Sequence, residues 1–448
     1  MEKSITVISQ ALEEMLTTKA EQLAQETGFV KRNRKISGAD FVQTLIFGWW
    51  QEPNISLRGF TQVMSRCNVS ITPSGLTQRF SQASADLMLR MLTSLSSLGL
   101  SNAAQPDIPL LRQFTSVIVE DSTVVSLPGE LIDLWKGYGK GRAGLKCYVR
   151  WDVLGGQLQG PRLTDAKNND RHSPFSEESI PAGGLYLADL GFFSLRWMKQ
   201  LIEHPDGQPR YLISRLRSGT GVCTLDGKRL DLRTVLPPAV GEARELEVLV
   251  GAQIKLPMRL LLVRVPKEVA EERRERMTVI AKENYRQIGE ETLYLADWTL
   301  LMTNVPQTML SLEEVLICYR LRWQIELLFK LWKSVMSLDE WRTKKKKPTR
   351  VLTEIYAKLC VMVIQQWFLQ AGCWDDPHRS FFQAAALLRR EANRVMMALR
   401  EGGLEKTVAS LLRQLAQAGG RLNHRNTSPG SDQLILERKI DWYLALLT

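Results

Sequence analysis

The chain has 448 residues, of which 44% are hydrophobic and 24% charged, a composition typical of a globular protein long enough for several domains. Its formal net charge of +11 favours polyanionic partners, with nucleic acid first among them. The N-terminus lacks a signal-peptide pattern and no apolar run approaches membrane-spanning length, so we expect a cytoplasmic protein without membrane contact.

Residues 1–107 predict a helical N-terminal domain. Within it, the sequence predicts a first helix from about Leu57 to Arg66 and a second that opens at Pro73, with Thr72 or Ser74 as its cap. This pattern fits a DNA-binding helix-turn-helix and a plain helical hairpin about equally well. In the first case, bases or phosphates would be faced by Thr77, Gln78, Arg79 and Gln82.

Residues 108–345 change to an α/β texture. Strand-like runs alternate with one helical run, which fits a mixed α/β core. The strand-like runs cover 114–127, two stretches of 144–163 joined by a turn at Gly155-Gly156, 183–193 and 210–216, and the helical run covers 196–204.

The segment at about 217–300 breaks this rhythm, because several strand-like runs surround one charged helical piece. We interpret it as a β-rich insertion. Helical pattern resumes at Leu312 and continues into a C-terminal helical domain, 346–448, which is a candidate for dimerisation. A hinge before that domain carries a basic run that suits either phosphate binding or simple solvation, namely Lys344, Lys345, Lys346 and Lys347.

Two apolar strands end in acids, Asp121 and Asp189. A carboxylate buried there without a partner is costly, and a divalent cation would relieve that cost. Glu120 is expected on the opposite face of its strand from Asp121. Taken singly, either aspartate is as well explained as a cap or turn residue. Scattered cysteines without a CxxC pair and four dispersed histidines argue against a zinc site or a disulfide framework.

The stretch 319–333, YRLRWQIELLFKLWK, predicts one helix with two faces. One face is apolar, made by Ile317, Leu321, Ile325, Leu328 and Trp332. The other presents a phenol and three cations around a single carboxylate, made by Tyr319, Arg322, Glu326, Lys330 and Lys333. A lone acid in a basic row suits a site that binds a divalent metal together with a phosphate backbone, whereas a generic charged helix would only be solvated.

This pattern, Y-x2-R-x3-E-x6-K, resembles the signature of the insertion-sequence transposases called the IS-four family, which are DDE enzymes. The resemblance covers about residues 115–335. It implies an RNase H-like mixed sheet core that is interrupted by a β-rich insertion and flanked by helical N- and C-terminal domains. Such cores carry one acid on the first strand, one on the fourth and one on a later helix, an order followed by Asp121, Asp189 and Glu326.

The resemblance also implies a chemistry. The three acids would be catalytic and would bind two Mg²⁺ ions, for which Mn²⁺ can substitute, about 3.5–4 Å apart. Tyr319, Arg322, Lys330 and Lys333 would contact terminal phosphates. Trp298 lies where the family carries a Trp that stacks on a base flipped from a hairpin tip, although a buried core aromatic is an almost equal alternative.

The sequence therefore predicts a cut-and-paste transposase that nicks DNA, forms and opens a hairpin, and joins the cut end to a target. Its partner would be double-stranded DNA, as terminal inverted repeats and as target, bound by a homodimer at the nucleoid. Two alternatives stay open: an inactive or domesticated relative that binds DNA without cutting it, and an RNase H-like nuclease that takes no part in transposition.

Overall fold

A computed structural model describes residues 2–31, 36–98, 100, 108–176, 178–283, 287–338, 347–373 and 380–418. The chain divides into two compact units. The first contains residues 1–106, 121–168 and 326–424, and the second contains 107–120, 169–325 and 425–448. Each unit is thus assembled from segments far apart in the sequence.

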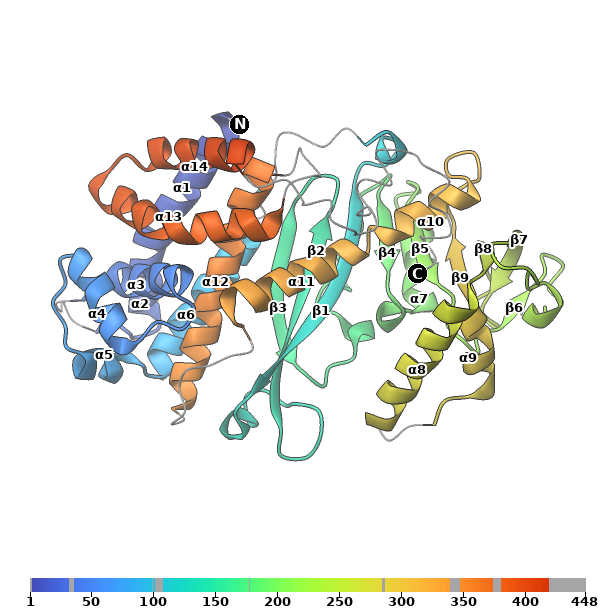
Figure 1. Ribbon diagram of the computed structural model, residues 1–448, viewed down its shortest axis with the longest axis horizontal. Helices are drawn as coiled ribbons and strands as arrows, with labels where there is room; N and C mark the ends of the chain where they lie inside the picture. Colours follow the sequence, from blue (N-terminus) through green and yellow to red (C-terminus); the bar gives the residue numbers. More distant parts are fainter. Residues whose placement is uncertain are drawn as a thin grey trace. The chain divides into compact units, whose positions relative to one another are not determined.

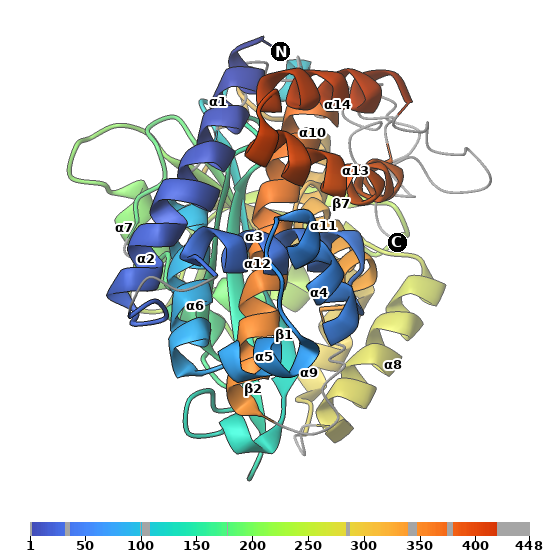
Figure 2. The same ribbon diagram turned by 90° about the vertical axis from the view of Figure 1, so that its left-hand side faces the viewer.

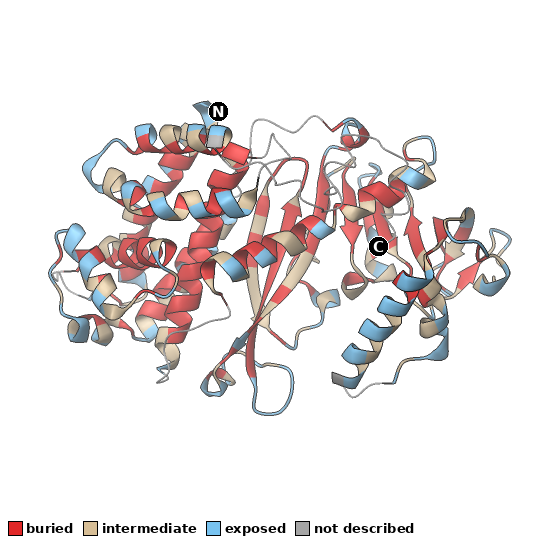
Figure 3. Cartoon of the chain, viewed as in Figure 1, coloured by how far each residue is buried: buried red, intermediate tan, exposed pale blue. Residues whose placement is uncertain are grey.

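The first unit is mainly helical. The chain begins with α1 (Glu2–Glu13), which passes through one π-helical turn (Glu14–Lys19) into α2 (Ala20–Glu26), and then forms α3 (Gly38–Gln51) and α6 (Gln82–Ser97). From the C-terminal part come α12 (Pro348–Cys373), α13 (Phe381–Glu401) and α14 (Leu404–Ala418). Helix α12 runs among the others (Figure 2) and is buried over almost its whole length, as expected for a helix that is apolar on every side (Figure 3).

The two short helices predicted near residue 60 are present. Helix α4 spans Leu57–Arg66, and α5 spans Pro73–Arg79 with Thr72 as its N-cap, whose side chain accepts a hydrogen bond from the Gly75 amide. Gln82, however, lies in α6 and not on the predicted second helix, because Ser81 caps a new helix directly after α5. The second helix is therefore only seven residues long.

The first unit also holds three strands: the end of β1 (Val117–Leu127), β2 (Ala143–Asp152) and β3 (Leu158–Asp165). Strands β2 and β3 pair antiparallel, with Leu145 opposite Asp165, and the predicted Gly155-Gly156 turn joins them. Helices α6 and α12 pack against β3. The N- and C-terminal helices thus share one body with this hairpin.

The second unit is built on a mixed sheet. The start of β1 pairs parallel with β4 (Leu185–Ala188), which pairs parallel with β5 (Tyr211–Arg215). Strand β9 (Trp298–Thr303) then pairs antiparallel with β5, and α7 (Leu195–Ile202) connects β4 to β5. The complete strand order is β3-β2-β1-β4-β5-β9-β8-β7-β6, so the predicted mixed α/β architecture with flanking helices is confirmed (Figure 1).

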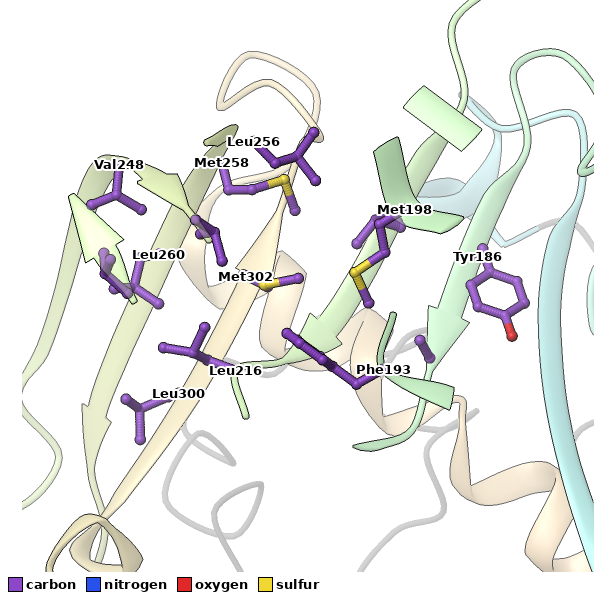
Figure 4. Packing of buried hydrophobic residues seen from close by; sticks show 14 of the residues in the cluster. Tyr186, Phe193, Met198, Leu216, Val248, Leu256, Met258, Leu260, Leu300 and Met302 are labelled. Carbon is purple, nitrogen blue, oxygen red and sulfur yellow. The ribbon is translucent and has the colours of Figure 1, made fainter. Parts of the chain in front are cut away.

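The segment predicted as a β-rich insertion contains β6 (Val222–Cys223), β7 (Ala243–Val250), β8 (Leu256–Arg264), α8 (Lys267–Glu283) and α9 (Glu290–Tyr294). Its strands do not form a sheet of their own. Strand β8 pairs with β9, with Leu261 opposite Leu301, and so extends the sheet of the second unit. A continuous apolar core links both parts, from Tyr186 and Met198 to Leu260 and Met302 (Figure 4).

Two further sequence predictions concern membrane-spanning helices and the cysteines. Among the described residues, no helix is long and apolar enough to cross a membrane. The apolar run that ends α12 is instead buried in the first unit. All six cysteines are buried, and none forms a disulfide.

Candidate active site

Asp121 lies in the middle of β1 and not at the end of its strand, where the sequence predicts it, because the strand continues to Leu127. Its neighbour Glu120 is only 2% exposed and accepts hydrogen bonds from the hydroxyls of Ser173 and Tyr186, the latter at 3.4 Å. Asp121 is half-buried, and its Oδ1 accepts a hydrogen bond of 2.7 Å from the Ser122 amide. Glu120 is therefore an interior residue, and Asp121 is the more exposed of the two acids.

Asp189 directly follows the fully buried strand β4, and its side chain is 37% exposed. The Arg322 Nε lies 3.8 Å from its Oδ1. The Tyr319 hydroxyl donates a hydrogen bond of 3.3 Å to the carbonyl of Ala188, the residue just before it. Three predicted site residues that are up to 133 positions apart in the sequence are thus brought together at the end of one strand.

Tyr319 is a neutral hydrogen-bond donor in this cluster. Burial raises the pKa of its phenol to about 12, against the opposing effect of the Arg322 guanidinium, and the Asp189 carboxylate raises it further. The guanidinium of Arg215 also acts on the Tyr319 pKa, lowering it. Arg215 ends β5 opposite Leu301, and no role is predicted for it from the sequence.

The helix predicted over 319–333 is in fact two helices, which corrects the prediction. Helix α10 (Leu312–Arg320) ends before Leu321, and α11 (Trp323–Met336) begins after Arg322. Between them, the amides of Leu321 and Arg322 donate to carbonyls three residues earlier, at 3.0 and 3.1 Å, which tightens the turn. Tyr319 and Glu326 therefore lie on different helices. The sequence could not predict this break, because no Gly or Pro marks it.

The two faces of this region agree with the prediction in their burial. The apolar face is between 0 and 8% exposed at every position, namely Ile317, Leu321, Ile325, Leu328 and Trp332. On α11, Glu326, Lys330 and Lys333 follow one another at intervals of four and three residues and share a face. Lys330 is exposed, and the other two are half-buried.

Trp298 is buried, with 5% of its surface exposed, in the core around β9. Its Nε1 donates a hydrogen bond of 2.9 Å to the Pro237 carbonyl, the Arg264 guanidinium lies 4.1 Å from the ring centroid, and Tyr294 packs beside it at 5.2 Å. Asp297 fixes this corner by pairing with Arg264 and Arg274. The packing fits the alternative interpretation of a core aromatic, and base stacking would require the ring to leave it.

The remaining predicted contacts are dispersed. Lys344, Lys345 and Lys346 lie outside the described residues, and Lys347 is exposed directly before α12. Arg79 is half-buried at the last position of α5. None of these positions, where described, belongs to the cluster around Asp189.

The predicted metal ligands are chemically suited to Mg²⁺, because all three offer carboxylate oxygens and none is fully buried. Within the described parts of the chain, no three His, Cys, Asp or Glu side chains form a group that could hold a metal ion. Asp121 and Glu326 belong to the first unit and Asp189 to the second, so the meeting of all three stays a prediction.

Comparison with known proteins shows similarity to one family. Residues 112–364 match the family model described as Transposase DDE domain. The chain is 26% identical to the transposase for insertion sequence element IS231B of Bacillus thuringiensis subsp. berliner, over 90% of this chain and 89% of that protein. It is 22% identical to the transposase for IS1151 of Clostridium perfringens, over 81% and 80%. It is 30% identical to the putative transposase InsL for IS186A of Escherichia coli (strain K12), over 58% and 67%.

Proposed function

Because the chain belongs to the family of DDE transposases, we propose that it moves an insertion sequence with Asp121, Asp189 and Glu326 as its catalytic carboxylates. The observation that carries this proposal is the cluster at the end of β4. There, an accessible carboxylate lies beside a guanidinium and a neutral phenol, all on one partly exposed surface. Such a set provides a metal ligand and phosphate-binding groups in one place.

The three carboxylates would hold two Mg²⁺ ions, for which Mn²⁺ can substitute. When bound, these ions supply Lewis-acid stabilisation of the charge that develops during phosphodiester cleavage. The placement of the acids supports an RNase H-like core, since Asp121 lies on the first strand, Asp189 after the fourth and Glu326 on a later helix. The parallel pairing of β1, β4 and β5 supports the same assignment.

The cations near these acids would position the DNA. Arg322 is held beside Asp189, so its guanidinium can bind a phosphate oxygen next to the reacting group. Lys330 and Lys333 lie on the same face of α11 as Glu326 and would hold neighbouring phosphates. Tyr319 stays protonated and can donate a hydrogen bond to a phosphate without adding charge. Arg215, whose guanidinium acts on Tyr319, would add one more positive charge to this phosphate-binding group.

The reaction would begin with a water oxygen attacking the phosphorus at the element's end, which releases a 3′-hydroxyl. That hydroxyl would attack the opposite strand, forming a hairpin and releasing the flanking DNA. A second water would open the hairpin, and the restored 3′-hydroxyl would attack target DNA. Each step exchanges one oxygen for another at phosphorus, so the same residues serve all of them.

The assembly belongs to the same proposal. Two copies of the chain would hold two paired DNA ends, with the C-terminal helical segment, 346–448, as the dimerisation domain. The helices of residues 1–107, including α4 and α5, would bind the terminal repeats, and residues 108–345 would form the catalytic domain. Trp298, if it leaves its packing, would stack on the flipped base.

The test is Glu326→Gln, measured by nicking and by gel shift on a duplex that carries the element's end. The amide keeps the shape of the side chain and loses a charged ligand, so Mg²⁺-dependent nicking should fall to background while end binding stays within about twofold. Chelation of Mg²⁺ should have the same effect on the wild-type protein. Asp121→Asn and Asp189→Asn should behave alike.

Glu313→Gln is the matched control, because Glu313 is an exposed glutamate in the first turn of α10. It should nick at the wild-type rate. Normal nicking by Glu326→Gln would remove the metal-binding role from that residue. A wild-type protein that binds ends and never nicks them, with Mg²⁺ or Mn²⁺, would instead identify an inactive relative.

A further inference from the structure

The connection between β1 and β2 carries a basic tip, defined here as residues 136–142, Lys-Gly-Tyr-Gly-Lys-Gly-Arg. This segment extends past the ends of the strands that it joins (Figure 1). Every second residue is glycine, three are cations, and none is acidic. Lys136, Lys140 and Arg142 are exposed, and Tyr138 is 56% exposed. The tip therefore presents only cationic and aromatic groups to solvent.

The base of the basic tip is firmly built. The Gly137 amide donates to the Arg142 carbonyl at 2.8 Å, and the Gly144 amide donates to the Trp135 carbonyl at 3.0 Å. A side chain at Gly137 would approach the Ala143 backbone to 2.9 Å, so only glycine fits there. The tip is also fastened to the rest of the first unit, because the Lys136 amide donates to Asp165 Oδ1 at 3.0 Å and the Trp135 indole donates to the Tyr356 hydroxyl at 3.2 Å.

The positive charge of the basic tip is not neutralised locally. Among the described residues, no carboxylate forms an ion pair with Lys136, Lys140 or Arg142, whereas exposed lysines elsewhere, such as Lys199 and Lys228, have such partners. The Asp165 carboxylate contacts the tip by accepting a hydrogen bond from the Lys136 backbone amide, and it forms no ion pair with the Lys136 ammonium. Three cations so presented favour a polyanion, and each would release counterions on binding one phosphate.

The aromatic ring in the basic tip points to the same class of ligand. The buried Lys146 ammonium lies 5.9 Å from the centroid of the Tyr138 ring, which orients the ring from the protein side. The tip has no Asn, Gln, Asp or Glu, the residues that read adenine or cytosine edges. Closely spaced glycines let the backbone approach a duplex. These features suit contact with sugars and phosphates, independent of base sequence.

We propose that the basic tip binds the backbone of the target DNA into which a cut end is joined. This proposal rests on the proposed function. The ends of an element have one sequence, which a protein can read from its bases, whereas each new target differs and must be held by its backbone. The tip has the groups for the second task, whereas for the first it has only side chains that can read guanine.

The test compares the double variant Lys140→Ala/Arg142→Ala with a matched control, Lys406→Ala/Arg413→Ala. The control removes the same charge from exposed positions on α14, in the same unit. Two reactions are measured with the full chain: cleavage of an end-containing duplex, and joining of a pre-cut end to a duplex of unrelated sequence. Joining is followed over a range of target and salt concentrations, and a thermal melt checks folding.

The double variant should need roughly tenfold more target DNA for half-maximal joining, and its salt dependence should be shallower by about 2 in log-log slope, since each lost phosphate contact removes about 0.9. End cleavage should stay within about twofold of the wild type. Tyr138→Ala should weaken joining in the same direction, and the control should match the wild type in both reactions.

Unchanged joining by the double variant would overturn the proposal. Equal loss of cleavage and joining would also overturn it, because the basic tip would then hold the element's end. Failure of the wild-type protein in both reactions would count against the proposed function instead, and the two results are therefore distinguishable.

Discussion

Replacing Trp298 tests whether this residue is a structural aromatic of the insertion. The ring is 5% exposed, its Nε1 binds the Pro237 carbonyl at 2.9 Å, and Arg264 covers one face at 4.1 Å from the centroid. Truncation of a buried Trp to Ala costs about 3–5 kcal/mol. Trp298→Phe keeps most of the ring and leaves the Pro237 carbonyl without its donor, which costs about 1–3 kcal/mol.

In a unit of this size, each kcal/mol lowers the melting temperature by roughly 2–4 °C, so Trp298→Ala should melt about 6–20 °C lower and Trp298→Phe about 2–12 °C lower. The assay pairs these melts with nicking and hairpin formation on an end duplex, well below both midpoints. If packing is the main role of Trp298, Trp298→Phe should support both steps at similar rates. A Trp298→Ala protein that melts with the wild type would refute the packing argument. A folded variant that nicks and forms no hairpin would show that the ring does stack on a base.

Two further predictions follow from buried groups. Lys358 is fully buried on α12, with its Nζ 2.9 Å from Glu354 Oε1 and 3.2 Å from the Ser337 carbonyl. Lys358→Met should destabilise the first unit by about 3–5 kcal/mol, because it leaves the Glu354 carboxylate buried without its partner. The double variant Glu354→Leu/Lys358→Met should recover most of that loss in a thermal melt. A single variant as stable as the wild type would contradict this ion pair. Tyr319→Phe loses one hydrogen bond, worth about 0.5–1.5 kcal/mol, and should slow nicking roughly two- to tenfold. Because burial raises the pKa of Tyr319 to about 12, the phenol is neutral throughout the working range, and the pH profile of nicking between about pH 6 and 9 should keep its shape in the variant. A changed profile would show that the phenol ionises during the reaction.

The sequence alone was sufficient wherever the signal is local. Helices α4 and α5 begin at the predicted residues, Leu57 and Pro73, and Thr72 caps α5, since capping depends on a few neighbouring positions. Glu120 and Asp121 are neighbours on β1 and so lie on opposite faces of the strand, as predicted. The apolar face from Ile317 to Trp332 is buried as its periodicity predicts, even though the helix breaks within it.

Only the tertiary structure decided features that depend on distant partners. Ser173 and Tyr186, more than 50 positions away, make Glu120 an interior residue, and β5 brings Arg215 to Tyr319. The insertion extends an existing sheet because β8 finds its backbone partners on β9, and no periodicity encodes which edge a strand will join. From the sequence, Trp298 is almost equally well explained as a base-stacking or a core aromatic, and its contacts with Pro237 and Arg264 are visible only in the structure. Local sequence patterns specify which face of a segment is buried, whereas the packing of the whole unit determines which residues contact that face.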